Sequence, residues 1–414
     1  MHAPAVDPDE TRSRRKKDKK TIDVDIDAAS EFFSFGFILG GKTLIRGVEL
    51  KQLPIPEVNH IKNATIDDVY KAIVDSVRET VEQASQPILL LSGGIDSRIL
   101  AGVIAEEKLD VPTVTFGSKW DKEITEEICR ILNLRNYFVK ISDIPPTDLA
   151  KIAEKTRGIS SVMTYALGPT VARFVRENKL GTSSITGGGG DEILGGFLHS
   201  RCSDSKSFYE MLIGRSRASA IKDLIKPEYL EKAADNLATF CQGLNIDEMF
   251  FRAFVNTRRR QIDFEAAGLL RSYTPFVSSY VMSAVYSIPY KKRINKQPQR
   301  RILKKYFPKL YKLRWSWSNL PTYLPFKVHV ATFYLLRQIE RKFGKKRRGL
   351  PFDHAIYLKS HSEFSELVLK NLPEICLKGQ TKRYITERKG EYEEVFYRFF
   401  TYALIFGHLE GVEN

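Results

Sequence analysis

Two glycine-rich loops hold the residues whose types and spacing could do chemistry. The first loop reads SGGIDS at residues 92–97, directly after a short apolar run. Where a strand runs into a helix, the backbone N–H groups of the loop and of the first helical turn point to one spot, which favours an anion such as phosphate. Glycines let the backbone approach that anion closely, and hydroxyl groups can donate further hydrogen bonds. The expected phosphate-binding residues are Ser92, Gly93, Gly94 and Ser97.

A carboxylate inside such a loop must have a function other than binding phosphate directly. Asp96 would repel a phosphate, so its presence makes sense if it holds Mg2+ against the phosphates. The loop does not match the Walker A pattern GxxxxGK[ST]. The plain alternative is a glycine-rich turn that joins a strand to a helix and binds nothing.

The second loop reads TGGGGDEILGGF at residues 186–197 and follows another predicted buried strand. Both loops would then open at the carboxyl edge of one sheet, where open α/β sheets bind their ligands. Asp191 becomes the natural second carboxylate for the same Mg2+. Taken alone the stretch could be a flexible loop, and its pairing with the first loop is what favours a ligand site.

The elements around these loops alternate between strands and helices. Short apolar runs predict buried strands at 88–91, 111–116, 137–141 and 183–186. Apolar residues at helical spacing predict helices at 97–107 and 123–132. A capping box at Thr65-Ile-Asp-Asp68 opens an earlier helix, and the chain is mostly helical beyond residue 205. The class is therefore α/β, a doubly wound parallel sheet with helices on both faces and a helical C-terminal region.

At this point the chain resembles a known family. SGGIDS resembles the pyrophosphate-binding loop of the N-type ATP pyrophosphatases, and GGGGDEILGGF resembles the second signature of the asparagine synthetases and their relatives, such as β-lactam synthetase and the lasso-peptide cyclases. The similarity covers roughly residues 32–310. It implies the adenine nucleotide alpha hydrolase-like fold and a reaction that cleaves ATP between its α and β phosphates. An acyl-adenylate forms, and an amine then displaces AMP.

The resemblance also implies roles for particular positions, with ATP and Mg2+ bound together. Asp96 and Asp191 would ligate the Mg2+ ion. The nucleotide would be lined by backbone groups of Leu90, Phe116, Gly117, Thr186 and Gly187.

A catalytic lysine that stabilises the leaving pyrophosphate belongs to the same resemblance. YTPFV at 273–277 lies where relatives carry an Arg-x-Pro-Phe-Leu-Asp segment, and QRRILK at 299–304 resembles the region of their lysine. Lys296 and Arg300 are the candidates for this electrostatic role. Either could instead be a solvated cation of a basic helix.

Three departures from the family limit the acceptor half of the reaction. Position two is His2 rather than a nucleophilic cysteine, and too few residues precede the first strand for a complete glutaminase domain, so we expect no glutamine hydrolysis. Gly188 replaces a glutamate that helps to deprotonate the attacking nitrogen, so a base must come from elsewhere. Arg271 and Tyr273 stand where relatives carry Glu and Arg. Together these changes argue against aspartate as the substrate.

The positive charge is concentrated in one basic segment, residues 291–348. The chain has a net charge of +15, and this segment carries 19 Lys and Arg against Glu340 alone. Aromatic residues interleave with the cations, so the segment could be a solvated face, bind an anionic saccharide or other carboxylated substrate, bind RNA, or lie on an acidic membrane surface. Of these, a solvated face beside a phosphate site fits best, and nucleic acid is not the expected partner.

The composition excludes several other classes. The chain has 414 residues, 43% hydrophobic, with no apolar run long enough for a membrane helix and no signal sequence. Its four cysteines are scattered without CxxC spacing, which indicates a cytoplasmic, reducing location and neither a disulfide framework nor a zinc site. We expect a disordered basic tail, a short β remnant of a glutaminase domain with strands over residues 32–50, the synthetase domain, and a basic, mainly helical extension, at 1–20, 21–60, 61–310 and 311–414.

The sequence thus predicts an ATP-dependent carboxylate–amine ligase that releases pyrophosphate. Its amine would be free ammonia, ammonia from a separate protein, or an amine on the substrate. A tRNA-modifying ATP pyrophosphatase is the second interpretation, because the basic segment could hold RNA. A non-catalytic nucleotide-binding relative is the third.

Overall fold

The computed structural model describes a central sheet and the helices around it. The described residues are 23–51, 54–140, 144–196, 201–216, 220–255, 267–343, 362–387 and 393–407. The basic tail expected at 1–20 and the last five residues of the basic segment lie outside these ranges.

The main sheet has five parallel strands in the order β3-β2-β1-β4-β5. They are β1 (Pro87–Leu90), β2 (Thr113–Thr115), β3 (Asn136–Phe138), β4 (Ser183–Ile185) and β5 (Arg271–Tyr273). The chain builds β1, β2 and β3 outward in one direction and then returns to add β4 and β5 on the other side of β1. The strand order therefore reverses between β1 and β4, which is where doubly wound sheets bind ligands.

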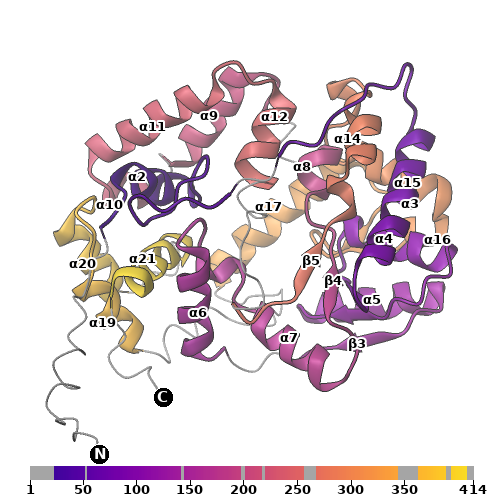
Figure 1. The fold of residues 1–414 in the computed structure, drawn as a ribbon, viewed down its shortest axis with the longest axis horizontal. Coiled ribbons are helices and arrows are strands. Elements are labelled where there is room, and N and C mark those ends of the chain that lie inside the picture. Colours follow the sequence, from indigo (N-terminus) through magenta and orange to yellow (C-terminus); the bar gives the residue numbers. More distant parts are fainter. Residues whose placement is uncertain are drawn as a thin grey trace, which may run out of the picture.

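Helices cover both faces of this sheet, as predicted. Successive residues of β1 point to opposite sides, so that Ile88 lies in one buried core and Leu89 in another. The helices of the Ile88 side include α6 (Pro146–Thr156) and α7 (Gly168–Glu177), whereas those of the Leu89 side include α3 (Ile66–Gln83), α4 (Ile95–Glu106) and α5 (Lys119–Leu132). Figure 1 shows the two groups around β4 and β5.

The predicted capping box at the start of α3 is present, since the Thr65 hydroxyl accepts from the N–H of Asp68 and the Asp68 carboxylate accepts from the N–H of Thr65. Strands β2, β3 and β4 are shorter than predicted, whereas β1 keeps its predicted length and lies one residue earlier. The apolar runs extend beyond the strands because they continue into buried loop positions such as Val111 and Leu91.

The prediction of short strands over 32–50 is wrong. The chain forms helix α2 (Ile26–Phe35), capped by the side chain of Asp25 and ended by Gly36 with a φ of 85°. The aromatic residues that suggested strands are buried between helices instead, with Phe33 against Phe399. Beyond α2 the chain makes only isolated bridges in the described part of this stretch, including Val24 with Ile45. Tertiary burial of aromatic side chains has overridden their strand preference here.

The rest of the described chain is mostly helical. Its helices are α8 (Gly190–Leu194), α9 (Ser205–Ser216), α10 (Ala220–Leu224), α11 (Pro227–Cys241), α12 (Ile246–Phe250), α14 (Ser279–Tyr286), α15 (Gln297–Tyr306), α16 (Pro308–Tyr311), α17 (Phe326–Phe343), α19 (Ser362–Lys370), α20 (Lys378–Glu387) and α21 (Glu393–Phe406). A hairpin of β6 (Arg314–Trp315) and β7 (Leu320–Pro321) precedes α17.

The C-terminal helices share a core with the sheet. Phe399 and Phe400 of α21 are buried in the same cluster as Ile88 of β1, and α21 packs on α6 (Figure 1). Helices α9, α11 and α12 form a third core with α2. Within the described residues, no helix combines the length and apolar character that crossing a membrane requires.

Candidate active site

Both predicted loops leave the sheet at its switch point. β1 ends at Leu90, and α4 begins at Ile95 with Gly94 as its N-cap residue. The neighbouring strand β4 ends at Ile185, and α8 begins at Gly190. Because β1 and β4 are adjacent and parallel, the two loops and the two helix N-termini lie at one edge of the sheet. The backbone N–H groups of both helical starts favour an anion at this edge.

The first loop is held by its own serines. The Ser92 and Ser97 hydroxyls are 2.9 Å apart, and the Ser92 hydroxyl also accepts from the N–H of Gly94 at 3.2 Å. The N–H of Ser92 donates to the Ser97 hydroxyl at 3.2 Å. These bonds fix the loop shape before any ligand binds.

The two loops touch each other through their glycines. A Cβ atom added at Gly190 would lie 2.8 Å from Cγ of Asp96, and one at Gly187 would lie 3.0 Å from the backbone nitrogen of Ser97. Real Cβ atoms do not fit at 2.8 Å, so Gly190 is required for this approach. Close packing of the loops is therefore a second reason for the glycines, beside room for a phosphate.

Asp96 and Asp191 meet at the ammonium group of Lys296. Nζ of Lys296 lies 2.7 Å from Oδ2 of Asp96 and 2.5 Å from Oδ1 of Asp191. The side chains of Lys296 and Asp96 are 8% and 16% exposed, whereas that of Asp191 is 55% exposed. The site is thus closed on the side of α4 and open on the side of the second loop.

Burial and charge act against each other at this cluster. Burial lowers the pKa of Lys296, but the charges of Asp191 and Asp96 raise it by more, so its pKa lies above the ordinary value and the ammonium stays charged. For Asp96, burial raises the pKa, Lys296 lowers it and Asp191 raises it again, and the net direction is upward. A buried carboxylate with a raised pKa gains from a further positive charge nearby.

The donors at this position fit a hard cation such as Mg2+. Oδ1 of Asp96 is buried and makes no hydrogen bond, although the other oxygen of the same carboxylate is bonded to Lys296. Mg2+ prefers carboxylate oxygens and usually completes its shell with phosphate oxygens and water. Within the described ranges no group of three or more His, Cys, Asp or Glu side chains forms a metal cluster. The chain itself would supply the Asp96 and Asp191 carboxylates.

An unusual turn delivers Lys296 to the two carboxylates. Asn295 and Lys296 both have left-handed backbones, with φ values of 61° and 56°. The N–H of Lys296 donates to the carbonyl of Gly195 at 2.8 Å, which ties the turn to the end of the second loop. Left-handed geometry is costly for residues other than glycine, so surrounding contacts must hold this turn in place.

Arg300 takes a different position from Lys296. It lies one turn further along α15, and its guanidinium donates to the backbone carbonyls of Tyr323 and Leu324. Of the two cations that the sequence proposed for catalysis, the structure brings Lys296 to the predicted carboxylates and directs Arg300 to the segment before α17.

The residues expected beside adenosine follow the carboxyl ends of neighbouring strands. Leu90 ends β1 and pairs in register with Val114, and both Phe116 and Gly117 follow β2. Thr186 and Gly187 follow β4 on the other side of β1. These positions therefore border the first loop from both sides.

At Gly188 the structure leaves little room for the glutamate of the relatives. A Cβ atom there would lie 3.1 Å from the Thr186 hydroxyl and 3.2 Å from a methyl group of Thr274. Both contacts are tighter than most Cβ contacts, so Thr274 and Thr186 must give way before a side chain fits. The absence of a base at this position matches the packing around it.

Sequence reasoning missed two residues that brace the first loop. Asp121 accepts from the N–H of Gly93 at 3.1 Å through one carboxylate oxygen, and caps α5 at Ser118 through the other. The capping-box spacing from Ser118 to Asp121 was a readable signal for this residue. The carboxylate connects the first loop to the end of β2.

The second missed residue is Arg98, which is fully buried under the first loop. Its guanidinium donates to four uncharged oxygens, the carbonyls of Gly93, Leu310 and Arg314 and the Thr322 hydroxyl. Burial lowers its pKa to about 10, which still leaves it charged at neutral pH. Arg98 joins the first loop to the β6–β7 hairpin. In the sequence, a charged residue inside the apolar run of α4 was the feature that could have pointed to Arg98.

One letter pattern in the sequence has no counterpart in the fold. GFILGGKT at residues 36–43 matches GxxxxGK[ST], yet it follows helix α2, and its lysine pairs with Glu31 at 3.6 Å. The Thr43 hydroxyl donates to the carbonyl of Val48. This arrangement is not the strand–loop–helix of a P-loop.

Comparison with known families agrees with this geometry. The family model described as asparagine synthase matches residues 68–317. The match spans the sheet, both glycine-rich loops and Lys296, and covers more than half of the chain. The chain therefore belongs to the asparagine synthase family, a family of ATP-dependent amide-forming synthetases that use ATP as a substrate. No curated protein matches the chain.

Proposed function

We propose that the protein activates a carboxylic acid with MgATP as an acyl-adenylate, releases pyrophosphate, and lets an amine displace AMP to form an amide. The observation that carries this proposal is the convergence of Asp96, Asp191 and Lys296 where two glycine-rich loops meet. A triphosphate placed there would face two helix N-termini and a buried cation.

The residues of the site would have separate roles in the activation step. The loop N–H groups and the serine hydroxyls would hold the pyrophosphate part of ATP. Mg2+, held by Asp96 and Asp191, would neutralise charge on the phosphates. The ammonium of Lys296 would stabilise the negative charge that develops as the bond between the α and β phosphates breaks. Arg300 would then support the segment before α17 rather than touch the phosphates.

The acceptor would arrive ready to react, because Gly188 supplies no base. We propose a carboxylated, anionic substrate other than aspartate, such as an acidic saccharide, with nitrogen from ammonia, from a separate ammonia-producing protein, or from an amine of the substrate. We propose no nucleic-acid partner. We also propose a cytoplasmic location, since all four cysteines are free and buried.

The direct test is pyrophosphate release with a panel of carboxylic acids, measured with and without Mg2+. We expect one class of acid to stimulate release. Both Asp96→Ala and Lys296→Met should then lower the turnover rate by about a hundredfold or more, because each removes charge at the reacting phosphates. Asp110→Ala and Lys305→Met are matched controls, since both side chains are exposed and lie in ion pairs elsewhere.

An unchanged rate of pyrophosphate release in Asp96→Ala would show that the active site is not where we place it. If no acid stimulates release, tRNA retention at low ionic strength would support a tRNA-modifying enzyme, because phosphate contacts weaken steeply with salt. Nucleotide binding without either result would support a non-catalytic relative.

A further inference from the structure

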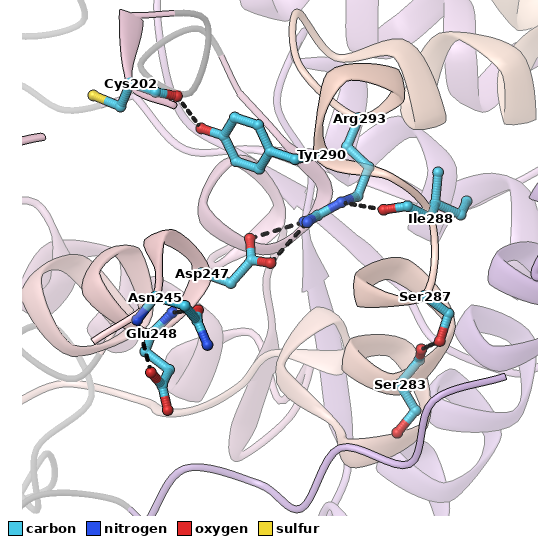
Figure 2. A network of polar contacts seen from close by, with 9 residues as sticks. All are labelled: Cys202, Asn245, Asp247, Glu248, Ser283, Ser287, Ile288, Tyr290 and Arg293. Carbon is cyan, nitrogen blue, oxygen red and sulfur yellow. Dashed lines mark hydrogen bonds and ion pairs between the residues drawn. The ribbon is translucent and has the colours of Figure 1, made fainter. Parts of the chain in front are cut away.

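A buried ion pair lies close to the turn that carries Lys296. The guanidinium of Arg293 donates two hydrogen bonds to the Asp247 carboxylate, at 2.9 and 2.7 Å, and its Nε donates to the carbonyl of Ile288 at 2.9 Å (Figure 2). The side chain of Arg293 is only 3% exposed. A two-bond pair of this kind fixes orientation as well as distance.

Aromatic rings hold the same guanidinium from its sides. The carbon centre of the guanidinium lies 5.1 Å from the ring centre of Tyr286 and 5.3 Å from that of Tyr290. The Tyr290 hydroxyl donates to the carbonyl of Cys202 at 2.6 Å (Figure 2). Arg293 is therefore fixed by charge, by hydrogen bonds and by packing.

The partner carboxylate lies on a helix with a capped start. Asp247 lies in the first turn of α12, whose start is closed by a capping box between Asn245 and Glu248 (Figure 2). Helix α12 belongs to the core of α9 and α11 rather than to the sheet. The pair thus joins that core to the chain segment that leads into α15.

The backbone of Arg293 lies directly against the second loop. A Cβ atom at Gly195 would be 2.3 Å from the carbonyl oxygen of Arg293, and Gly195 itself has a φ of 91°. Three residues later, the N–H of Lys296 donates to the carbonyl of Gly195. The segment 293–296 is therefore pressed onto the end of the loop that contains Asp191, with the Arg293–Asp247 pair at its beginning.

We propose that Arg293 and Asp247 are positioning residues, which hold the left-handed turn at Asn295 and Lys296 so that the ammonium stays between Asp96 and Asp191. The significance for catalysis rests on the proposed function, but the positioning itself does not. Without the pair, the turn would lose its anchor and could relax toward ordinary backbone geometry.

The position of Lys296 can be measured without knowledge of the substrate. An amine-reactive acylating reagent labels lysines that are accessible and deprotonated, and mass spectrometry of peptides gives the labelling rate at Lys296 alone. In the native chain this rate should be low, because the side chain is buried and paired with two carboxylates. Both Asp247→Asn and Arg293→Lys should raise it roughly tenfold or more, since the turn opens locally.

The matched control is Asp148→Asn, which breaks the 2.8 Å ion pair between Asp148 of α6 and Arg173 of α7. Labelling of Lys296 should stay within about twofold of the native rate in this variant, because its ion pair is separate from the turn. An equal rise in Asp148→Asn would overturn the proposal, as would a native rate in both Asp247→Asn and Arg293→Lys. If Asp247→Asn does not fold, the labelling rate of Lys296 in the milder variant Arg293→Lys decides between the two outcomes.

Pyrophosphate release separates this proposal from the proposed function. Given an active acid, Arg293→Lys should lower kcat and leave the KM for ATP nearly unchanged, because the loops that hold ATP are intact. A lower affinity for ATP with unchanged kcat would contradict positioning of Lys296. Absence of release in the native chain would overturn the proposed function and leave the labelling result intact.

Discussion

Arg98 and Lys296 are two buried cations with different partners. Lys296 is balanced by the carboxylates of Asp96 and Asp191. Arg98 is surrounded by uncharged oxygens from the first loop, α16 and the β6–β7 hairpin. A buried charge without a counterion is retained where its hydrogen bonds hold several segments together. Its positive charge beneath the first loop also favours an anion above it.

Replacing Arg98 should therefore cost stability. Arg98→Leu leaves buried carbonyl oxygens without donors, so we expect the free energy of unfolding to fall by about 3 kcal/mol. Urea unfolding monitored by tryptophan fluorescence measures this change, with Arg301→Leu on the exposed face of α15 as the control. A loss below about 0.5 kcal/mol would mean that the four bonds contribute nothing net.

At the residue scale, the sequence could identify the loop residues but not choose the cation. Asp96 and Asp191 were readable because each lies where a glycine-rich loop joins a strand to a helix, so their positions depend on local structure. Lys296 and Arg300 were indistinguishable in sequence, because the choice depends on a left-handed turn whose Lys296 N–H donates to the carbonyl of Gly195, in a distant part of the chain.

At the scale of elements, the strand–helix alternation was predictable because each unit carries its own pattern. The apolar run of β1 and the capping box of α3 are local signals, and both were confirmed. Helix α2 was mistaken for strands because its aromatic residues favour strands in isolation. Its burial against α11 and α21 involves residues some two hundred and more positions away, which no local pattern reveals.

Helix α2 also contains a titratable group that makes stability depend on pH. Glu31 is buried, and burial raises its pKa to about 7, although Lys42, the N–H of Leu39 and Asn236 pull it down. The folded chain keeps a proton that the unfolded chain loses near pH 4.5. The contribution to stability is therefore fully present below pH 4.5 and is lost as the pH rises through 7.

Glu31→Gln should remove this dependence, because glutamine keeps an acceptor for Leu39 and does not titrate. Between pH 5 and pH 8 the free energy of unfolding of the native chain should fall relative to that of the variant, by on the order of 3 kcal/mol. Urea unfolding at both pH values checks this. Equal pH slopes in the two proteins would show that Glu31 does not titrate in this range.

At the scale of the whole molecule, two cores cover the two faces of the sheet, and a third core lies among α2, α9, α11 and α12. The family match covers the sheet and the loops, whereas α19 and α21 lie beyond it, with α21 packed on α6 and α19 packed on α21. The basic segment was visible in the sequence as a run of positive charge, but its cations lie in different surroundings in the structure. Lys296 lies in the site, Arg314 contacts Glu123, and Lys304 and Lys312 are exposed. A charge count could not separate these roles, because it contains no information on burial.

The most direct test of the account is a crystal structure of the chain with α,β-methylene-ATP and Mn2+, whose anomalous signal locates the metal. We predict a Mn2+ peak in direct contact with the carboxylates of Asp96 and Asp191, with the β and γ phosphates over the SGGIDS loop and Nζ of Lys296 beside the α–β bridge. A nucleotide bound away from this loop, or a metal that touches neither aspartate, would contradict the central claim.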